Sequence, residues 1–345
     1  MSETIAPTVD CEPLPWQREA ARGWLRDREH WPHGWLLHGP AGFGKRTLAL
    51  YIARTLLCES PREGGACGEC AGCRWFAQGQ HPDFRLLEPL VEEEESDKAP
   101  ATVVKIDQIR ALGEFLQLTS HRQGAKVALI HPAEAMNAAA ANALLKTLEE
   151  PPPRSYLLLV SDQPGRLPAT VRSRCRAVPV PRPGTREAED WLRQQGSGNP
   201  ALHLAQAGGA PLRALACSDA DWQEARQSLL ATLSRPRALS PVAVGARIDA
   251  VAKPQRKETL ARWCDWLCAW THDLAALAGG GEVRFNPDFR EALLRLVGEA
   301  DRIRLQRFYR ILLEQRALLA HPLQPRLVAE SLLLQYREAV CGDQG

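Results

Sequence analysis

A glycine-rich loop between an apolar run and a helical segment constrains the fold of this chain more than any other feature. Residues 34–38 are a short apolar run typical of a buried strand, and residues 45–57 have helical spacing. The residues between them, 39–45 (GPAGFGK), satisfy the pattern G-x-x-x-x-G-K. Glycines let backbone N–H groups point at phosphate oxygens, and the helix N-terminus adds its dipole. The sequence therefore predicts a phosphate loop; the alternative is a glycine-rich turn that binds no ligand.

Strands and helices continue to alternate after this loop. Apolar runs at residues 127–130 and 156–160 predict two more buried strands, and helical spacing recurs at residues 14–30, 106–116 and 137–150. The last of these helices is expected to end at a run of three prolines. Strands that alternate with helices predict an α/β fold with a parallel sheet covered on both faces.

The character of the chain changes after Val178. Prolines and a glycine at residues 179–184 predict a hinge-like segment, and short helical patterns follow it to about residue 217. From residue 221 to the end leucines and tryptophans recur at helical spacing, with no clear strand. We therefore predict an α/β domain at residues 1–180, a small helical domain at 181–220 and an all-α domain at 221–345.

The phosphate loop lacks the usual means of holding magnesium. Arg46 stands where magnesium coordination needs Ser or Thr, and the hydroxyl of Thr47 comes one residue late. The second strand runs into His131-Pro132, where a hydrolytic ATPase carries acidic residues, and Glu134 is expected to begin the next turn. We predict that hydrolysis is absent, and the sequence leaves open whether the loop binds nucleotide. The candidate residues of this degenerate loop are Gly39, Gly42, Gly44, Lys45, Arg46 and Thr47.

Four cysteines form a candidate metal site. Cys67, Cys70 and Cys73 follow the pattern C-x-x-C-x-x-C, and Cys58 supplies a fourth thiol. Four thiolates suit tetrahedral zinc, and glycines between them permit the tight turns that aim the sulfurs at one point. An iron–sulfur cluster uses similar spacing, but nothing in the sequence indicates redox chemistry, so we favour zinc over it and over four free thiols. Because protein would fill all four positions, the site is predicted to be structural.

Composition excludes several classes of protein. With 45% hydrophobic and 24% charged residues, the chain is neither disordered nor fibrous. A net charge of +2 rules out a polybasic protein that wraps nucleic acid by bulk charge alone. Together with the lack of an evident basic helix, it also argues against a zinc-stabilised DNA-binding protein. The longest uncharged stretch, residues 194–212, is too polar to cross a membrane, and residues 1–13 do not resemble a secretion signal. We expect a cytoplasmic protein, with the acidic run at residues 92–95 in a solvated loop.

Two later segments point to a family. Residues 142–152 read NALLKTLEEPP, and residues 167–175 read LPATVRSRC. Together with the phosphate loop and the four-cysteine insertion, these segments resemble bacterial clamp-loader subunits of the AAA+ class. The resemblance covers residues 14–213 well, and residues 330–334 (ESLLL) near the end are also similar.

The resemblance implies an architecture and a function. It implies an AAA+ RecA-like domain with a zinc module at residues 58–73, a helical lid at 181–220 and a helical collar for oligomerisation at 221–345. Because the magnesium ligands are missing, the chain is most similar to the stator of the DNA polymerase III clamp loader, which does not hydrolyse ATP. Such a subunit joins the γ/τ ATPase subunits and δ in a hetero-pentamer that loads the β sliding clamp onto primer–template DNA. The alternative is an active γ/τ-like ATPase with unusual magnesium ligands.

The resemblance also implies roles for single residues. Arg174, in the motif Ser-Arg-Cys, is expected to act in trans as an arginine finger on the ATP of a neighbouring subunit. The alternative is a surface arginine, one of four within residues 166–176. Ser161 and Asp162 fall where ATPase relatives carry a polar nucleotide sensor. Arg213 matches a lid arginine that contacts phosphate in active relatives, and it is equally compatible with a charge on a helix surface.

Overall fold

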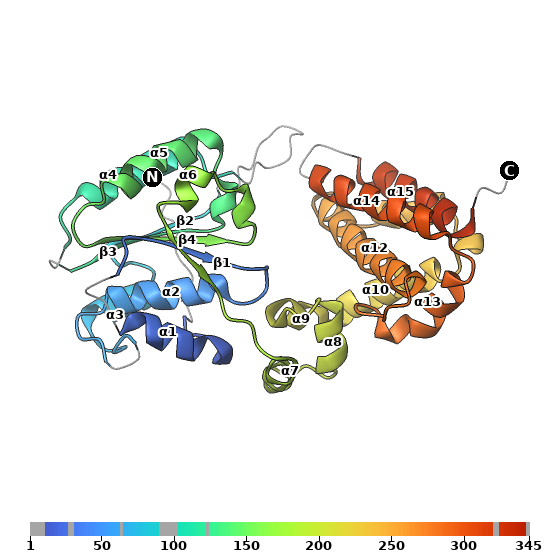
Figure 1. The fold of residues 1–345 in the computed structure, drawn as a ribbon, viewed down its shortest axis with the longest axis horizontal. Coiled ribbons are helices and arrows are strands. Elements are labelled where there is room, and N and C mark those ends of the chain that lie inside the picture. The colour runs from blue at the N-terminus through green and yellow to red at the C-terminus, as the bar shows by residue number, and fades with distance from the viewer. Residues whose placement is uncertain are drawn as a thin grey trace. The chain divides into compact units, whose positions relative to one another are not determined.

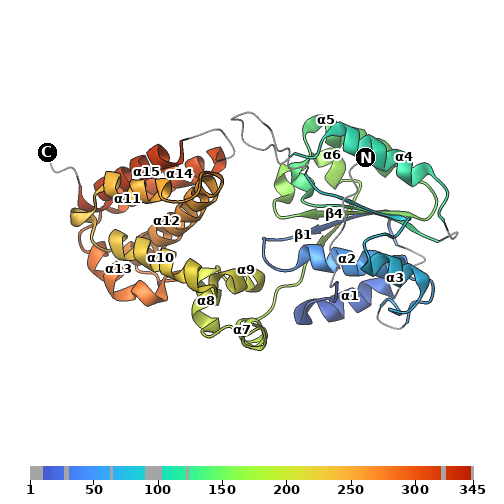
Figure 2. The ribbon, with the colours of Figure 1, turned by 180° about the vertical axis from the view of Figure 1, so that it is seen from behind.

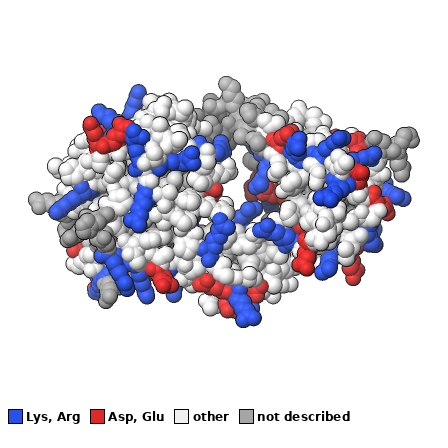
Figure 3. All heavy atoms as spheres, viewed as in Figure 1, with Lys and Arg blue, Asp and Glu red and all other residues white. Residues whose placement is uncertain are grey.

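A computed structural model describes residues 11–26, 31–62, 65–89, 103–121, 124–319 and 324–342. The acidic run at 92–95 and most of the N-terminal segment compared with a secretion signal lie outside these residues. The chain divides into two compact units, the first containing the described residues up to Glu187 and the second beginning at Ala188 (Figure 1). Basic and acidic side chains are interspersed on the visible face of each unit (Figure 3), in keeping with the small net charge.

The first unit is built on a parallel sheet of five strands in the order β2-β3-β4-β1-β5. The strands are β1 (Gly34–His38), β2 (Phe84–Leu87), β3 (Lys126–Ile130), β4 (Ser155–Ser161) and β5 (Arg176–Pro179). The three predicted strands are the three central ones. The two edge strands, β2 and β5, were not predicted.

Helices cover both faces of this sheet. One layer contains α1 (Arg18–Leu25), α2 (Lys45–Leu56) and α3 (Ala71–Ala77), and the other contains α4 (Ile106–Gln117), α5 (Ala138–Glu149) and α6 (Ala169–Arg172) (Figures 1 and 2). Side chains of a strand alternate between these layers, so that Trp35 and Leu37 pack into one core and Leu36 into the other. This arrangement confirms the predicted α/β fold.

Local sequence sets the helix ends that matter for the sites. Gly44, with φ +81°, is the N-cap of α2, so the loop turns directly into the helix. Asn137 caps α5, because its side-chain oxygen accepts the N–H of Ala140 at 2.8 Å. The prolines that begin at Pro151 end the same helix. The predicted helix at residues 14–30 is shorter than expected: a 3₁₀ turn at Pro15–Gln17 precedes α1, and residues 27–30 lie outside the described part.

The second unit contains no strand among its described residues, which confirms the all-α prediction for the C-terminal part. Its helices are α7 (Thr185–Gln194, which begins just before the division), α8 (Pro200–Gln206), α9 (Pro211–Cys217), α10 (Ala220–Leu233), α11 (Pro241–Asp249), α12 (Arg256–Ala278), α13 (Arg290–Val297), α14 (Arg302–Leu318) and α15 (Pro325–Cys341). Trp270 and Tyr336 lie at the centre of its core. The Trp270 Nε1–H donates to Tyr336 Oη at 2.9 Å, and that hydroxyl donates to Leu233 O at 2.7 Å, so both polar tips are satisfied. None of the described helices combines the length and the apolar character needed to cross a membrane.

Candidate functional site

The phosphate loop lies at the carboxyl end of β1, as predicted. Gly39, Gly42 and Gly44 all have positive φ values, +148°, +84° and +81°, which only glycine adopts readily. A Cβ atom on Gly44 would lie 2.3 Å from Leu14 Cδ1, so the segment before α1 packs directly against the loop. The loop therefore has the backbone conformation that the sequence pattern requires, and the chain in front of it covers one side.

The buried side chain of Gln17 hydrogen-bonds to the phosphate loop. Gln17 Nε2 donates to Phe43 O at 2.8 Å and to Gly44 O at 3.1 Å, and its side-chain oxygen accepts the N–H of Leu14 at 3.1 Å. Gln17 is fully buried, so these bonds satisfy an amide that would otherwise be costly to desolvate. The phosphate loop is thus fixed by protein groups.

The loop lysine already has an anionic partner. Lys45 Nζ lies 2.5 Å from Asp162 Oδ1 and 2.5 Å from Pro40 O, and Lys45 is only 4% exposed. Asp162 follows directly on β4, so the sheet topology brings it to the loop. Ser161 is fully buried, and its hydroxyl accepts the N–H of Gln163 at 3.2 Å. A nucleotide phosphate would have to compete with Asp162 for the lysine.

An arginine–glutamate–histidine cluster lies where magnesium would be expected. Arg46 Nε is 2.8 Å from Glu88 Oε1, and His131 Nδ1 is 3.5 Å from the same oxygen. Glu88 follows β2, His131 follows β3, and Arg46 is the second residue of α2, so three elements contribute. Thr47 comes one residue farther along α2, about 100° around the helix. The Arg46–Glu88 ion pair and the His131 ring therefore occupy this region.

The Glu134 carboxylate accepts hydrogen bonds from backbone N–H groups. It lies in a 3₁₀ turn, and its Oε1 accepts the N–H groups of Asp162 at 2.9 Å and Gln163 at 3.1 Å. The carboxylate therefore fixes the end of β4 next to the lysine-binding aspartate. This agrees with the expectation that Glu134 begins the turn after the second predicted strand.

Burial lowers the pKa of His131 below its usual value of 6.5, although Glu88 acts in the opposite direction. The unfolded chain therefore takes up a proton at a higher pH than the folded chain, so stability should fall as pH drops through 6.5 and be unaffected by this group above it. We expect His131→Asn to lose less thermal stability than the wild type between pH 7.5 and 5.5, as measured by melting temperature. Equal losses in the two chains would contradict this.

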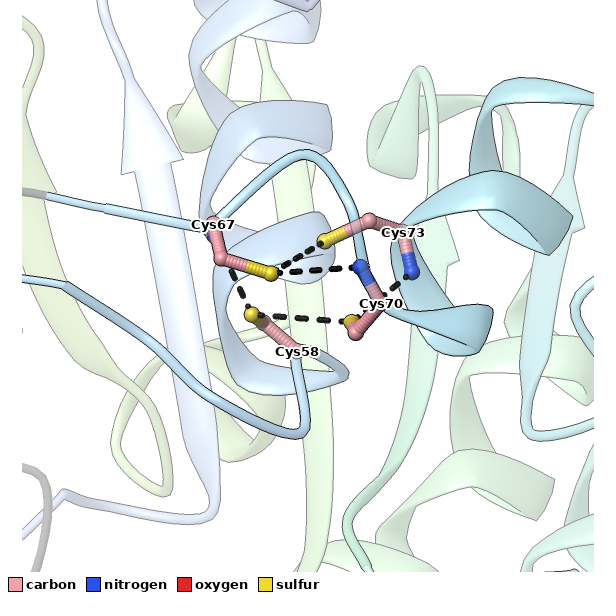
Figure 4. Close-up of side chains that lie close together, drawn as sticks. All are labelled: Cys58, Cys67, Cys70 and Cys73. Carbon is pink, nitrogen blue, oxygen red and sulfur yellow. Dashed lines mark hydrogen bonds between the residues drawn. The ribbon is translucent and has the colours of Figure 1, made fainter.

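The four predicted cysteines come together in space (Figure 4). Their ligand sulfurs all lie within 4.8 Å of one another, so the cluster could hold a metal ion. Each knuckle is closed by a backbone N–H that points at a sulfur: Cys67 N donates to Cys58 Sγ at 3.2 Å, Cys70 N to Cys67 Sγ at 3.4 Å, and Cys73 N to Cys70 Sγ at 3.4 Å. N–H groups arranged in this way stabilise negative charge on sulfur.

The local fold and electrostatics fit thiolate ligands. A Cβ atom on Gly72 would lie 2.6 Å from Leu57 O, so the turn into α3 needs glycine to approach the end of α2. Backbone N–H groups of Glu69 and Cys70 lower the pKa of Cys67 to about 6, which favours its thiolate form at neutral pH. Burial raises the pKa of Cys73 to about 12, which is the cost of holding a thiolate there without a compensating cation.

Arg174 lies at the surface of the first unit, between α6 and β5. Its Nη2 is 2.7 Å from Glu149 Oε1, and its Nη1 donates to Thr170 O at 3.0 Å. Glu149 is the last residue of α5, so the structure brings together the two segments that carried the family resemblance, residues 142–152 and 167–175. The Arg174 side chain is 36% exposed.

Known proteins are similar to this chain in sequence. A family model described as "DNA polymerase III, delta subunit" matches residues 25–183. The DNA polymerase III subunit δ′ of Pseudomonas aeruginosa is 36% identical over 93% of this chain and 96% of its own length. The chain belongs to the DNA polymerase III δ′ family. The clamp-loader resemblance drawn from the sequence motifs is thereby confirmed.

A second relative and a solved structure are also similar to this δ′-family chain. The δ′ subunit of Escherichia coli is 35% identical over 65% of this chain and 64% of its own length. Among solved structures, a DNA polymerase III γ-subunit-related protein of Thermotoga maritima is similar over 94% of this chain and 99% of its own length. The two chains are 18% identical, and the TM-score is 0.45.

Three residues of this δ′-family chain were missed by sequence reasoning. Gln17 lies on the buried side of the N-terminal helical segment. Its polar character at that position is the only sequence feature that indicates its contact with the phosphate loop. Glu88 follows an edge strand that was not predicted, so its place beside Arg46 had no basis in the sequence. Glu149 lies in a recognised motif, but only the packing of α5 against α6 brings it to Arg174.

Arg213 belongs to the second unit. It lies on α9, and its Nη2 is 3.9 Å from Asp265 Oδ2 on α12. Asp265 also pairs with Arg316 Nε at 2.9 Å. Arg213 is therefore one of two arginines that share one aspartate within the helical unit.

Proposed function

We propose that this δ′-family chain is the non-hydrolysing stator of a DNA polymerase III clamp loader. In this role it assembles with γ/τ ATPase subunits and δ and helps load the β sliding clamp onto primer–template DNA. The observation that carries the proposal is the pairing of Lys45 with Asp162 at 2.5 Å. Arg46 and His131 flank Glu88 where an ATPase would bind magnesium. The loop keeps its fold, while the ion pairs of Lys45 with Asp162 and of Arg46 with Glu88 engage the groups that could hold phosphate or magnesium.

The same proposal divides the chain into an AAA+ domain at residues 1–180, a lid at 181–220 and a collar at 221–345. The packing of the second unit supports this division. The large hydrophobic core of that unit draws its buried members from residues 229–340. The buried apolar residues of α7–α9 lie outside that core, as expected for a small separate lid.

We propose that Arg174 acts in trans on the γ-phosphate of ATP bound to a neighbouring ATPase subunit. A guanidinium is planar and always charged, and it can donate two parallel hydrogen bonds to phosphate oxygens. The exposure of Arg174, two residues after the end of α6, supports this role, because a buried guanidinium could not reach another chain. A chain without hydrolysis of its own could then control hydrolysis by its neighbour.

We propose that the cysteine cluster holds one structural zinc ion. Four sulfurs at a zinc–sulfur distance of about 2.3 Å lie about 3.8 Å apart in a tetrahedron. The sulfur atoms of Cys58 and Cys70 are 3.9 Å apart, and so are those of Cys67 and Cys73. This distance fits the tetrahedral geometry and is longer than the S–S bond of a disulfide. Bound zinc would cross-link the end of α2 to α3. Protein fills all four ligand positions, so none is left for substrate.

The isolated chain should show negligible magnesium-dependent ATP turnover, and Lys45→Ala should leave that rate unchanged. The reason is that Asp162 pairs with the loop lysine, and the Glu88 carboxylate near the loop is already paired with Arg46. Phosphate release by the purified chain measures this directly. The competing function, an active ATPase with unusual magnesium ligands, predicts magnesium-dependent turnover that Lys45→Ala abolishes.

A further inference from the structure

Glu149 and Arg174 form a surface ion pair that no function above requires. We propose that Glu149 is a positioning residue, which presents the Arg174 guanidinium to the ATP of the neighbouring subunit. This inference rests on the proposed action of Arg174 in trans. It is carried by the 2.7 Å contact between Arg174 Nη2 and Glu149 Oε1, together with the 3.0 Å bond from Nη1 to Thr170 O.

The backbone is fixed on both sides of this pair. Leu148, next to Glu149, is 2% exposed, and Cys175, next to Arg174, packs against the same core. A Cβ atom on Gly34 would lie 3.0 Å from Leu148 Cδ2 and 3.2 Å from Arg174 O, so the start of β1 fits closely against both segments. Packing therefore holds the backbone at both residues, and the long side chain of Arg174 is the part that Glu149 can position.

The location of Glu149 favours a role beyond helix stability. It is the last residue of α5, where the helix dipole disfavours a negative charge. Its carboxylate instead limits the rotamers of a long side chain that would otherwise lose conformational entropy on meeting a phosphate. Ordering that side chain in advance lowers the entropic cost of reaching the transition state.

The pair is arranged to guide the guanidinium without trapping it. One carboxylate oxygen makes the recorded contact, and the side chains are 36% and 49% exposed, so the pair is of the weak, solvent-screened kind. A guanidinium carries five N–H donors, and the contacts to Glu149, Thr170 and Ser173 leave donors for a phosphate. A γ-phosphate with its larger charge can therefore bind without a strong competitor.

The neighbouring Glu150 provides a matched control. It carries the same charge one residue later, is exposed, and has no recorded contact with Arg174 among the described residues. The experiment compares Glu149→Gln, Glu150→Gln, Arg174→Ala and the double variant Glu149→Gln/Arg174→Ala, each assembled into a complete clamp loader. Clamp- and DNA-stimulated ATP turnover gives kcat and KM, and size-exclusion chromatography verifies assembly.

We expect Glu149→Gln to lower kcat about threefold to fivefold, an effect of the size of an exposed ion pair, with KM for ATP unchanged. Glu150→Gln should stay within about 1.5-fold of wild type, and Glu149→Gln should add nothing in the Arg174→Ala background. Wild-type kcat in Glu149→Gln, or an equal loss in the Arg174→Ala background, would overturn the positioning role while the proposed function stands. An unchanged kcat in Arg174→Ala would instead remove the proposed function of Arg174 on which the inference rests.

Discussion

Arg174→Ala in a reconstituted clamp loader should lower clamp- and DNA-stimulated ATP turnover by at least about tenfold while the complex still assembles. An arginine finger is worth about 10³–10⁵ in kcat at the site it serves. The measured fall is expected to be smaller, because steps other than phosphoryl transfer, such as product release, limit kcat in many enzymes. Assembly should survive, since Arg174 is an exposed side chain whose recorded contacts are with Glu149, Thr170 and Ser173.

Two further variants test whether the effect of Arg174 comes from its guanidinium group or only from its positive charge. Arg172 is an exposed arginine at the end of α6, two residues before Arg174, so Arg172→Ala removes the same charge from the same surface. It should leave turnover within about twofold of wild type, because exposed charges contribute little by themselves. Arg174→Lys keeps the charge but not the planar fork, and should recover only part of the loss. Full turnover by Arg174→Ala in an intact complex would make this chain an architectural subunit.

The central part of the sheet could be predicted from sequence because of where its strands lie. β1, β3 and β4 are covered by helices on both faces, so they read as continuous apolar runs. β2 and β5 lie at the two edges and contain Arg85 and Arg176, whose exposed side chains break that pattern. Their pairing depends on contacts with β3 and β1, which are remote in the chain and leave no local signal.

The candidate sites also differ in how far they could be predicted from sequence. The cysteine cluster and the phosphate loop are local in sequence, so spacing alone predicted which residues would meet. Sequence reasoning also predicted that Arg46 and His131 cannot replace the usual magnesium ligands. It could not find their shared partner Glu88, because only the parallel order of β2 beside β3 brings that residue to the loop. The pairing of Lys45 with Asp162 likewise depends on β4 lying next to β1.

Removing the metal should destabilise the first unit strongly. The cluster fixes α3, whose Phe76 is 3% exposed and packs against Phe84 with ring centroids 4.8 Å apart. Loss of the metal leaves mutually repelling or protonated thiols and frees α3 from the sheet, so apolar surface of Phe76 returns to water. We expect Cys70→Ser, or complete chelation of the wild type, to cost about 3–5 kcal/mol and to lower the melting temperature of this unit by roughly 10 °C.

Three comparisons show whether such a loss comes from the metal. Elemental analysis should find one zinc per wild-type chain and almost none in Cys70→Ser, whereas one or more irons would indicate an iron–sulfur cluster instead. Cys341→Ser, a thiol of similar partial burial outside the cluster, should retain the metal and the wild-type melting temperature of the first unit. Chelation should not lower the stability of Cys70→Ser any further, because that variant has already lost the site. A wild-type chain that melts at the same temperature after complete metal removal would show that the four cysteines fold without help from an ion.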